Sequence, residues 1–147
     1  MKKIFSLMIC ALAVCGWMKA QTLNIEVGQV TYLFPAEQAG IMNYTDGSML
    51  TVMDKVFALA EVGEMYVNET SVVDNTVRVV YNEASATVVV AGNVAKYLTV
   101  SVSGAHVDIA QSEDLAEEIT YTLSGSSTDG EFYMSGSYKA ILELNGL

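Results

Sequence analysis

Few side chains in this 147-residue sequence have the chemistry needed for catalysis or metal binding. His106 is the only histidine, and the two cysteines, Cys10 and Cys15, lie near the start of the chain. A transition-metal site needs several nitrogen or sulfur ligands, so we expect a lone histidine in a strand-like segment to be a structural or surface residue. The sequence therefore predicts no metal site and no catalytic residue.

The carboxylates and serines also lack the spacing of catalytic or calcium-binding motifs. Four carboxylates within residues 113–118 form an acidic cluster, but it lacks the alternating Asp or Asn residues and the glycine of a calcium loop. Serines near Gly125 and Gly136 are not part of a G-x-S-x-G elbow. We interpret the acidic cluster as a solvated connector and the serines as turn residues, and expect no enzyme activity.

Tyrosine is the one residue type that suggests a ligand. The chain has eight tyrosines, and an aromatic ring can stack on the apolar face of a sugar. Tyr133 and Tyr138 lie close together in sequence near the C-terminal end, and are the candidate ligand-binding residues. The alternative is that strand tyrosines pack at the edge of a core, because aromatic residues favour strands.

The elements that must position these residues are short segments of alternating apolar and polar residues, as expected for β-strands. The most regular stretch, residues 118–147, holds three such segments separated by turns rich in Ser, Gly or Asn. Upstream, residues 28–29, 46–47 and 82–85 are turn signals between pairs of strands and predict three hairpins.

Other stretches are less regular. Residues 54–67 fit either a helix or two strands joined by a turn, and we favour the strands because Gly63 interrupts the helical pattern. Residues 35–40 form a loop or a single helical turn after the only proline, and residues 92–96 form a loop. Three consecutive valines at 88–90 indicate a strand buried on both faces.

These patterns predict an all-β protein with three parts. Residues 1–20 are a signal peptide, residues 21–75 a small antiparallel β unit, and residues 76–147 the start or cap of a β-helix domain. The strand spacing in the last part fits a β-solenoid, in which the chain coils through parallel strands, and it also fits a β-sandwich. A solenoid coil buries its flank only against the next coil, so we expect the chain to continue beyond residue 147.

Residues 1–20 have the pattern of a secretory signal peptide. Lys2 and Lys3 precede a short apolar stretch, and Ala20 ends the segment. The apolar stretch is shorter than the about 20 residues that span a bilayer. We therefore expect an exported protein, extracellular, periplasmic or on the cell surface, with no transmembrane segment after cleavage. Residues 12–15 resemble a lipoprotein box, but Val14 replaces the usual small residue, which disfavours a lipid anchor at Cys15.

Cleavage after Ala20 would leave an acidic chain without thiols. Three of the seven basic residues and both cysteines precede this point, so the remainder has a formal net charge of 4 − 17 = −13. Such a surface repels phosphates, and we expect no nucleic-acid partner. Without disulfides, an apolar core must hold the fold together.

Two segments resemble the N-terminal portion of exported bacterial proteins described as carbohydrate-binding domain-containing. They are VAGNVAKYLTVSVSGAHVDIAQS at residues 90–112 and EEITYTLSGSSTDGEFYMSGSYKAILELNGL at residues 117–147. The segments TLNIEVGQVTYLFPAEQAG and YTDGSMLTVMDKVFALAEV resemble the region that precedes them. The resemblance implies a right-handed parallel β-helix that binds plant polysaccharides and calcium, and it places the expected sugar and calcium sites in the part of the helix beyond residue 147.

We therefore expect an exported, non-catalytic protein that binds plant or dietary polysaccharide, with no cofactor in this part of the chain. The resemblance assigns no site residues, so Tyr133 and Tyr138 remain candidates on chemistry alone. The alternative is a structural or adhesive cell-surface β module with no sugar site.

Overall fold

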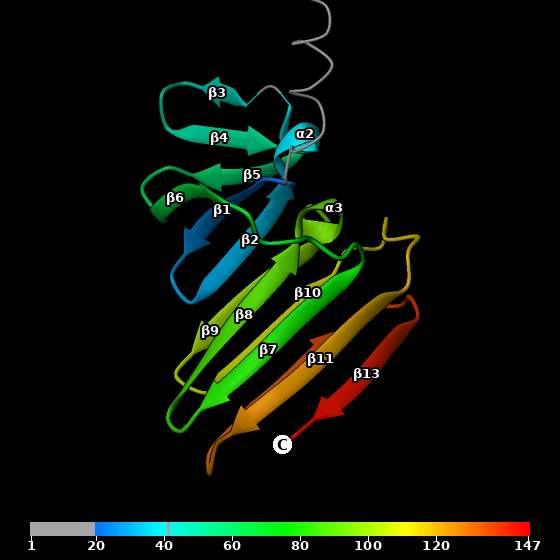
Figure 1. Cartoon of the computed structure of the whole chain (residues 1–147). Helices are drawn as coiled ribbons and strands as arrows, with labels where there is room; N and C mark the ends of the chain where they lie inside the picture. The colour runs from blue at the N-terminus through cyan, green and yellow to red at the C-terminus, as the bar shows by residue number, and fades with distance from the viewer. Residues whose placement is uncertain (1–19, 41) are drawn as a thin grey trace, which may run out of the picture.

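A computed structural model describes residues 20–40 and 42–147. The predicted signal peptide, with Cys10 and Cys15, lies outside these residues except for Ala20. Strands dominate the described chain and its helices are two single turns, so the predicted all-β fold class is confirmed (Figure 1). In this part of the chain, no helix has the length and apolar character needed to cross a membrane.

The described strands form one large sheet and two small ones. In chain order the elements are β1 (Thr22–Val27), β2 (Val30–Pro35), α2 (Ala36–Ala39), β3 (Asn43–Thr45), β4 (Met49–Val52), β5 (Lys55–Ala58), β6 (Val62–Asn68), β7 (Thr76–Asn82), β8 (Ser85–Ala91), α3 (Gly92–Ala95), β9 (Leu98–Ser103), β10 (His106–Gln111), β11 (Ile119–Ser126), β12 (Glu131–Ser135) and β13 (Ala140–Asn145). The seven-stranded sheet has the order β13-β11-β7-β8-β2-β1-β6, and the three-stranded sheets are β12-β10-β9 and β3-β4-β5.

Local turn chemistry explains the hairpins, and all three predicted hairpins are confirmed. They are β1–β2, β3–β4 and β7–β8, each paired antiparallel. In the second, Asp46 and Gly47 have φ values of 52° and 67°, the left-handed conformation that an Asp-Gly turn favours. The two strands favoured within residues 54–67 are also confirmed as β5 and β6.

Two local predictions need correction. Residues 92–96 are not a loop throughout, because α3 forms a helical turn that buries Val94 and Ala95 in the core. Gly92 permits this turn, since a Cβ atom there would overlap the Phe34 ring. The valine run is not buried on both faces either: Val88 and Val90 are fully buried, but Val89 is partly exposed on the uncovered face of the sheet.

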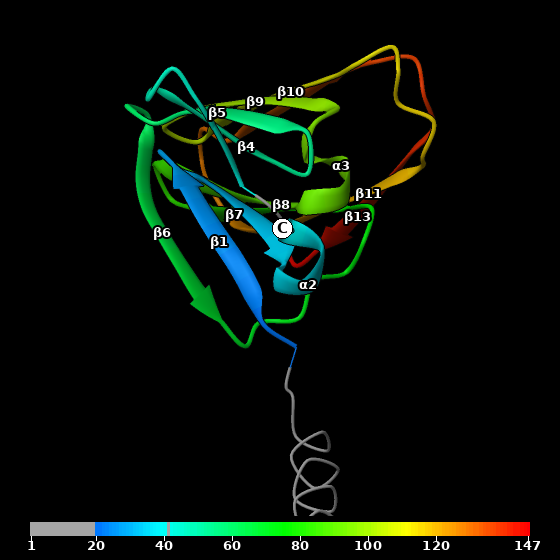
Figure 2. The ribbon, with the colours of Figure 1, turned by 90° about the horizontal axis from the view of Figure 1, so that it is seen from above.

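Both three-stranded sheets lie over the same face of the seven-stranded sheet (Figure 2). Over β2, the Phe57 ring of β5 packs edge-on against Tyr32 and Phe34, with ring centroids 5.1 and 6.1 Å away. Over β11, the rings of Tyr121 and Phe132 are 5.9 Å apart. A single apolar core therefore fills the space between the two layers.

The seven-stranded sheet joins strands from both predicted β units. β2 pairs in parallel with β8, although the two lie on opposite sides of residue 75. The two small sheets are also linked, because Lys55 Nζ donates a hydrogen bond to the Leu98 carbonyl at 2.8 Å and Lys96 Nζ lies 2.9 Å from Asp54 Oδ2. The residues before and after the predicted boundary therefore share one core.

The C-terminal strands stack in parallel. β12 lies beside β10 and β13 beside β11, both without a shift in register. From β10 onward the chain therefore alternates between the small sheet and the large one. Within residues 20–40 and 42–147, the sheets close into neither a barrel nor a complete solenoid.

Gly125 is required for the close pairing of β7 and β11. Its φ is 90°, and a Cβ atom there would overlap the carbonyl oxygen of Tyr81. We expect Gly125→Ala to lower the free energy of unfolding by about 2–4 kcal/mol, because it adds both backbone strain and a clash. Chemical denaturation measures this change in the free energy of unfolding. The control is Gly63→Ala, whose new Cβ would be 3.8 Å from its nearest neighbour; equal losses in both variants would contradict the account.

Three core tyrosines predict how stability depends on alkaline pH. Burial raises the pKa of Tyr32, Tyr81 and Tyr121; the Glu131 carboxylate adds to the rise at Tyr81, and a hydrogen bond from Gln111 opposes it at Tyr121. Their stabilising contribution is therefore complete below the usual tyrosine pKa of about 10 and is lost as pH rises through the raised values.

We expect the phenolate absorbance of these three tyrosines to appear only together with loss of the near-ultraviolet circular dichroism. Tyr121→Phe removes one ionising group, so it should shift this joint transition to higher pH. Ionisation of all eight tyrosines below pH 10 with the dichroism intact would contradict the burial of these rings.

Candidate functional site

The outer face of the β12-β10-β9 sheet carries the candidate site. Strand alternation turns Val107, Ile109 and Phe132 toward the core, so their neighbours in sequence point outward. The outward side chains form two rows across the three strands, which are Ser103, His106 and Glu131 in one row and Ser101, Asp108 and Tyr133 in the next. We call these six residues the Tyr133 face.

The Tyr133 face is hollowed rather than flat. All six of its residues line a hollow of about 270 Å³. A second hollow of about 320 Å³ adjoins it at Ser103 and His106, and Thr128 and Asp129 line its far side. Neighbouring strands are about 4.8 Å apart, so side chains within a row can contact one small ligand together.

His106 lies between two carboxylates at the junction of the hollows. Its Nδ1 atom is 3.2 Å from Glu131 Oε2, and its Nε2 atom is 3.6 Å from Asp129 Oδ2. The carboxylates thus lie on either side of the imidazole, and 51% of the histidine side chain stays exposed. The ring and the two carboxylates therefore offer hydrogen-bond donors and acceptors to a molecule in either hollow.

Tyr133 supplies the aromatic surface of the site. Its side chain is on the edge strand β12 and is 56% exposed, although most aromatic rings of the C-terminal strands pack inward. In the parallel register it lies directly beside Asp108, and Ser101 follows on the third strand. An accessible ring beside a carboxylate and a hydroxyl can contact both the apolar and the polar surfaces of a ligand.

Tyr138, the other candidate from the sequence, lies elsewhere. It follows the end of β12 in the loop before β13, is 41% exposed, and lines neither hollow of the Tyr133 face. The sequence pattern predicts His106 to be a structural or surface residue and does not single out Asp108, Asp129 or Glu131. Strand alternation indicates that Asp108 and Glu131 are exposed, but only the parallel pairing of β10 and β12 brings them together, and Asp129 comes from the loop that precedes β12.

The other predicted chemical groups remain apart from this face. Residues 113–118 form a connector between β10 and β11 without regular secondary structure, in which Leu115 alone is buried. The predicted connector is therefore confirmed. Among the residues that the structure describes, no group of three or more His, Cys, Asp or Glu side chains is arranged to hold a metal ion.

Comparisons with protein-family models, with curated proteins and with solved structures gave no match for this chain.

Proposed function

We propose that the protein binds carbohydrate without catalysing a reaction, and that the Tyr133 face is its binding surface. The observation that carries this proposal is an exposed tyrosine ring in a hollow lined by carboxylate, imidazole and hydroxyl groups. A sugar ring has an apolar C–H face that stacks on Tyr133 and a rim of hydroxyls that donate to Asp108 and Glu131.

The charge of the face favours a neutral glycan. Asp108, Asp129 and Glu131 contribute three carboxylates around one histidine, and the chain without residues 1–20 has a net charge of −13. The negative electrostatic potential of these groups repels both uronate-rich polysaccharides and nucleic acids. We therefore propose neutral segments of plant or dietary polysaccharide as the ligand.

The exposure of the carboxylates supports binding rather than hydrolysis. A glycosidase keeps one carboxyl group protonated near neutral pH, usually by burying it, while a second stays ionised. The side chains of Glu131 and Asp129 are 65% and 89% exposed, so neither is buried in the way that a glycosidase's acid is. We therefore assign them to hydrogen bonding with sugar hydroxyls.

Export fits this role. A polysaccharide too large to enter a cell must be bound outside it, and the pattern of residues 1–20 predicts secretion. We propose that the protein acts outside the cytoplasm, without a lipid anchor at Cys15. Ala20 lies two residues before β1, so cleavage after it would leave every strand of the described fold in place.

Replacing Tyr133 tests the proposal. We expect the wild-type protein to bind at least one neutral oligosaccharide on a glycan array, and Tyr133→Ala to weaken that binding about tenfold or more in calorimetry, because the stacking surface is lost. The matched control is Tyr44→Ala on β3, since Tyr44 is similarly exposed at 59% but distant in the fold.

Three outcomes decide the test. Equal losses from Tyr133→Ala and Tyr44→Ala would contradict the assignment of the site. Loss of binding in Tyr138→Ala alone would move the site to the β12–β13 loop. Failure of the wild-type protein to bind any glycan on the array would contradict carbohydrate binding and favour the structural alternative.

A structural or adhesive role is the second candidate, and the edge strand β13 favours it. Leu142 and Leu144 point to the same side of the large sheet as the buried Tyr121 and Leu123, yet they are 55% and 66% exposed. We propose that β10 to β13 form coils of a β-solenoid and that strands of a second molecule cover these leucines. The parallel stacking of β12 on β10 and β13 on β11 supports this proposal.

The exposed leucines give this candidate its own test. We expect the double variant Leu142→Ser and Leu144→Ser to bind less of a hydrophobic dye and to self-associate less in analytical ultracentrifugation, with little change in thermal stability. Val56→Ser on β5 is the control, since Val56 is 50% exposed away from this edge. Dye binding and sedimentation equal to wild type in the double variant would contradict an adhesive edge.

A further inference from the structure

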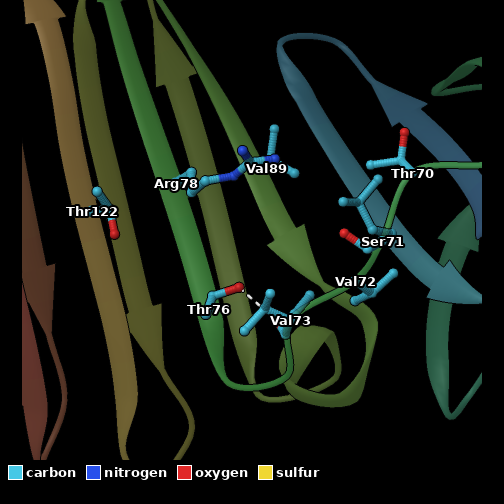
Figure 3. A pocket seen from close by; sticks show the side chains of 10 residues that line it. Thr70, Ser71, Val72, Val73, Thr76, Arg78, Val89 and Thr122 are labelled. Carbon is cyan, nitrogen blue, oxygen red and sulfur yellow. Dashed lines mark hydrogen bonds between the residues drawn. The ribbon is translucent and has the colours of Figure 1, made fainter.

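A separate hollow lies on the outer face of the seven-stranded sheet, on the side turned away from both small sheets. Its volume is about 290 Å³, and the β6–β7 connector forms one wall of it (Figure 3). The residues that matter for its chemistry are Val72, Val73, Thr76, Arg78, Val89 and Thr122. We call it the Arg78 hollow.

Arg78 is the only arginine of the chain and carries the only positive charge in this hollow. It is exposed and, within residues 20–40 and 42–147, forms neither an ion pair nor a side-chain hydrogen bond. Lys96, by contrast, pairs with Asp54 at 2.9 Å. An unpaired guanidinium is notable in a chain with 17 carboxylates and only seven lysines and arginines.

The register of the sheet explains why Arg78 has no partner. Its neighbours across the sheet are Val89 on β8 and Thr122 on β11. Glu143 follows on β13 but lies two strands away and accepts a hydrogen bond from Thr122 Oγ1 at 3.3 Å. The Arg78 side chain extends over Val89, away from Thr122 (Figure 3), so its charged end points into the hollow.

The wall of the hollow is fixed at both ends. Near β6, Thr22 Oγ1 donates a hydrogen bond to the carbonyl of Thr70. Near β7, Thr76 Oγ1 donates to the carbonyl of Val73 at 2.7 Å, and the amide of Asn75 donates to the side chain of Asn93 at 3.1 Å. The connector thus holds Val72 and Val73 in place opposite Val89, and Val73 is 66% exposed.

We propose that the Arg78 hollow binds a small organic acid. The carboxylate of the ligand pairs with the guanidinium, whose planar donors match two carboxylate oxygens. The aliphatic body of the ligand covers Val72, Val73 and Val89, and the hydroxyl of Thr122 borders the site. This site is on a different sheet from the Tyr133 face, and the proposal does not rest on carbohydrate binding.

Size and charge define the ligand class further. A hollow of about 290 Å³ is at the lower end of small-molecule pockets, which suits a molecule smaller than a typical drug. The net negative charge of the protein repels multiply charged anions, so a monocarboxylate is favoured over a polyanion. A branched aliphatic monocarboxylate meets both conditions.

The test is a ¹H–¹⁵N NMR titration of the purified protein with 4-methylpentanoate. We expect shifts confined to the residues around Arg78, and at least tenfold weaker binding of acetate and of the uncharged 4-methylpentanamide. Arg78→Gln should weaken binding at least tenfold while leaving the rest of the spectrum unchanged, because Arg78 is exposed and supports no other side chain. Lys139→Gln removes an equal charge outside the hollow and should bind as the wild type does.

Other results would overturn the proposal. It fails if 4-methylpentanoate causes no shifts, or if its shifts lie away from the hollow. It also fails if Arg78→Gln binds as tightly as Lys139→Gln, or if the amide binds as tightly as the acid. Binding of oligosaccharide at the Tyr133 face plays no part in these outcomes, so the two proposals succeed or fail separately.

Discussion

The whole structure depends on burying one face of the seven-stranded sheet. Side chains on that face, such as Ile25, Val79, Val88 and Tyr121, have no measurable exposure. The described residues contain no cysteine, so no disulfide can replace this packing. Each such side chain contributes about 1.5–3 kcal/mol through burial, and the sum must offset the ordering of the chain. The two three-stranded sheets together cover this face of the seven-stranded sheet.

This constraint also determines where the two candidate sites lie. Because the inner faces of the sheets are filled, the outer faces are left for polar groups. On the β12-β10-β9 sheet, these groups form the rows of the Tyr133 face. On the large sheet, the connector of residues 69–75 crosses the outer face and creates the Arg78 hollow. The two sites have different chemistry because one gathers carboxylates around a ring and the other surrounds a single guanidinium with valines.

Local features of the fold could be predicted from sequence, and distant pairings could not. Turn residues such as Asp46 and Gly47 specify hairpins within a few residues, and alternation identifies strands. The parallel pairs β2–β8, β7–β11 and β10–β12 join segments far apart in the chain, and no local pattern encodes them. The helical turn at Gly92 was missed for the same reason, since it depends on contact with Phe34.

The same limit applies to the candidate site. Tyr133 was recognisable as an aromatic residue in an alternating strand, and its exposure agrees with that interpretation. Its neighbour Asp108 is 25 positions earlier, and only the register of β10 and β12 places the two side by side. A shift of that register by one residue would turn Tyr133 into the core and Phe132 to solvent.

The register of β10 and β12 therefore provides the most direct test. Interstrand nuclear Overhauser effects in the purified protein should connect the backbones of Asp108 and Tyr133, and should connect the ring of Phe132 with that of Tyr121. Effects that instead place the Tyr133 ring against Tyr121, with Phe132 free of contacts to the core, would contradict the account.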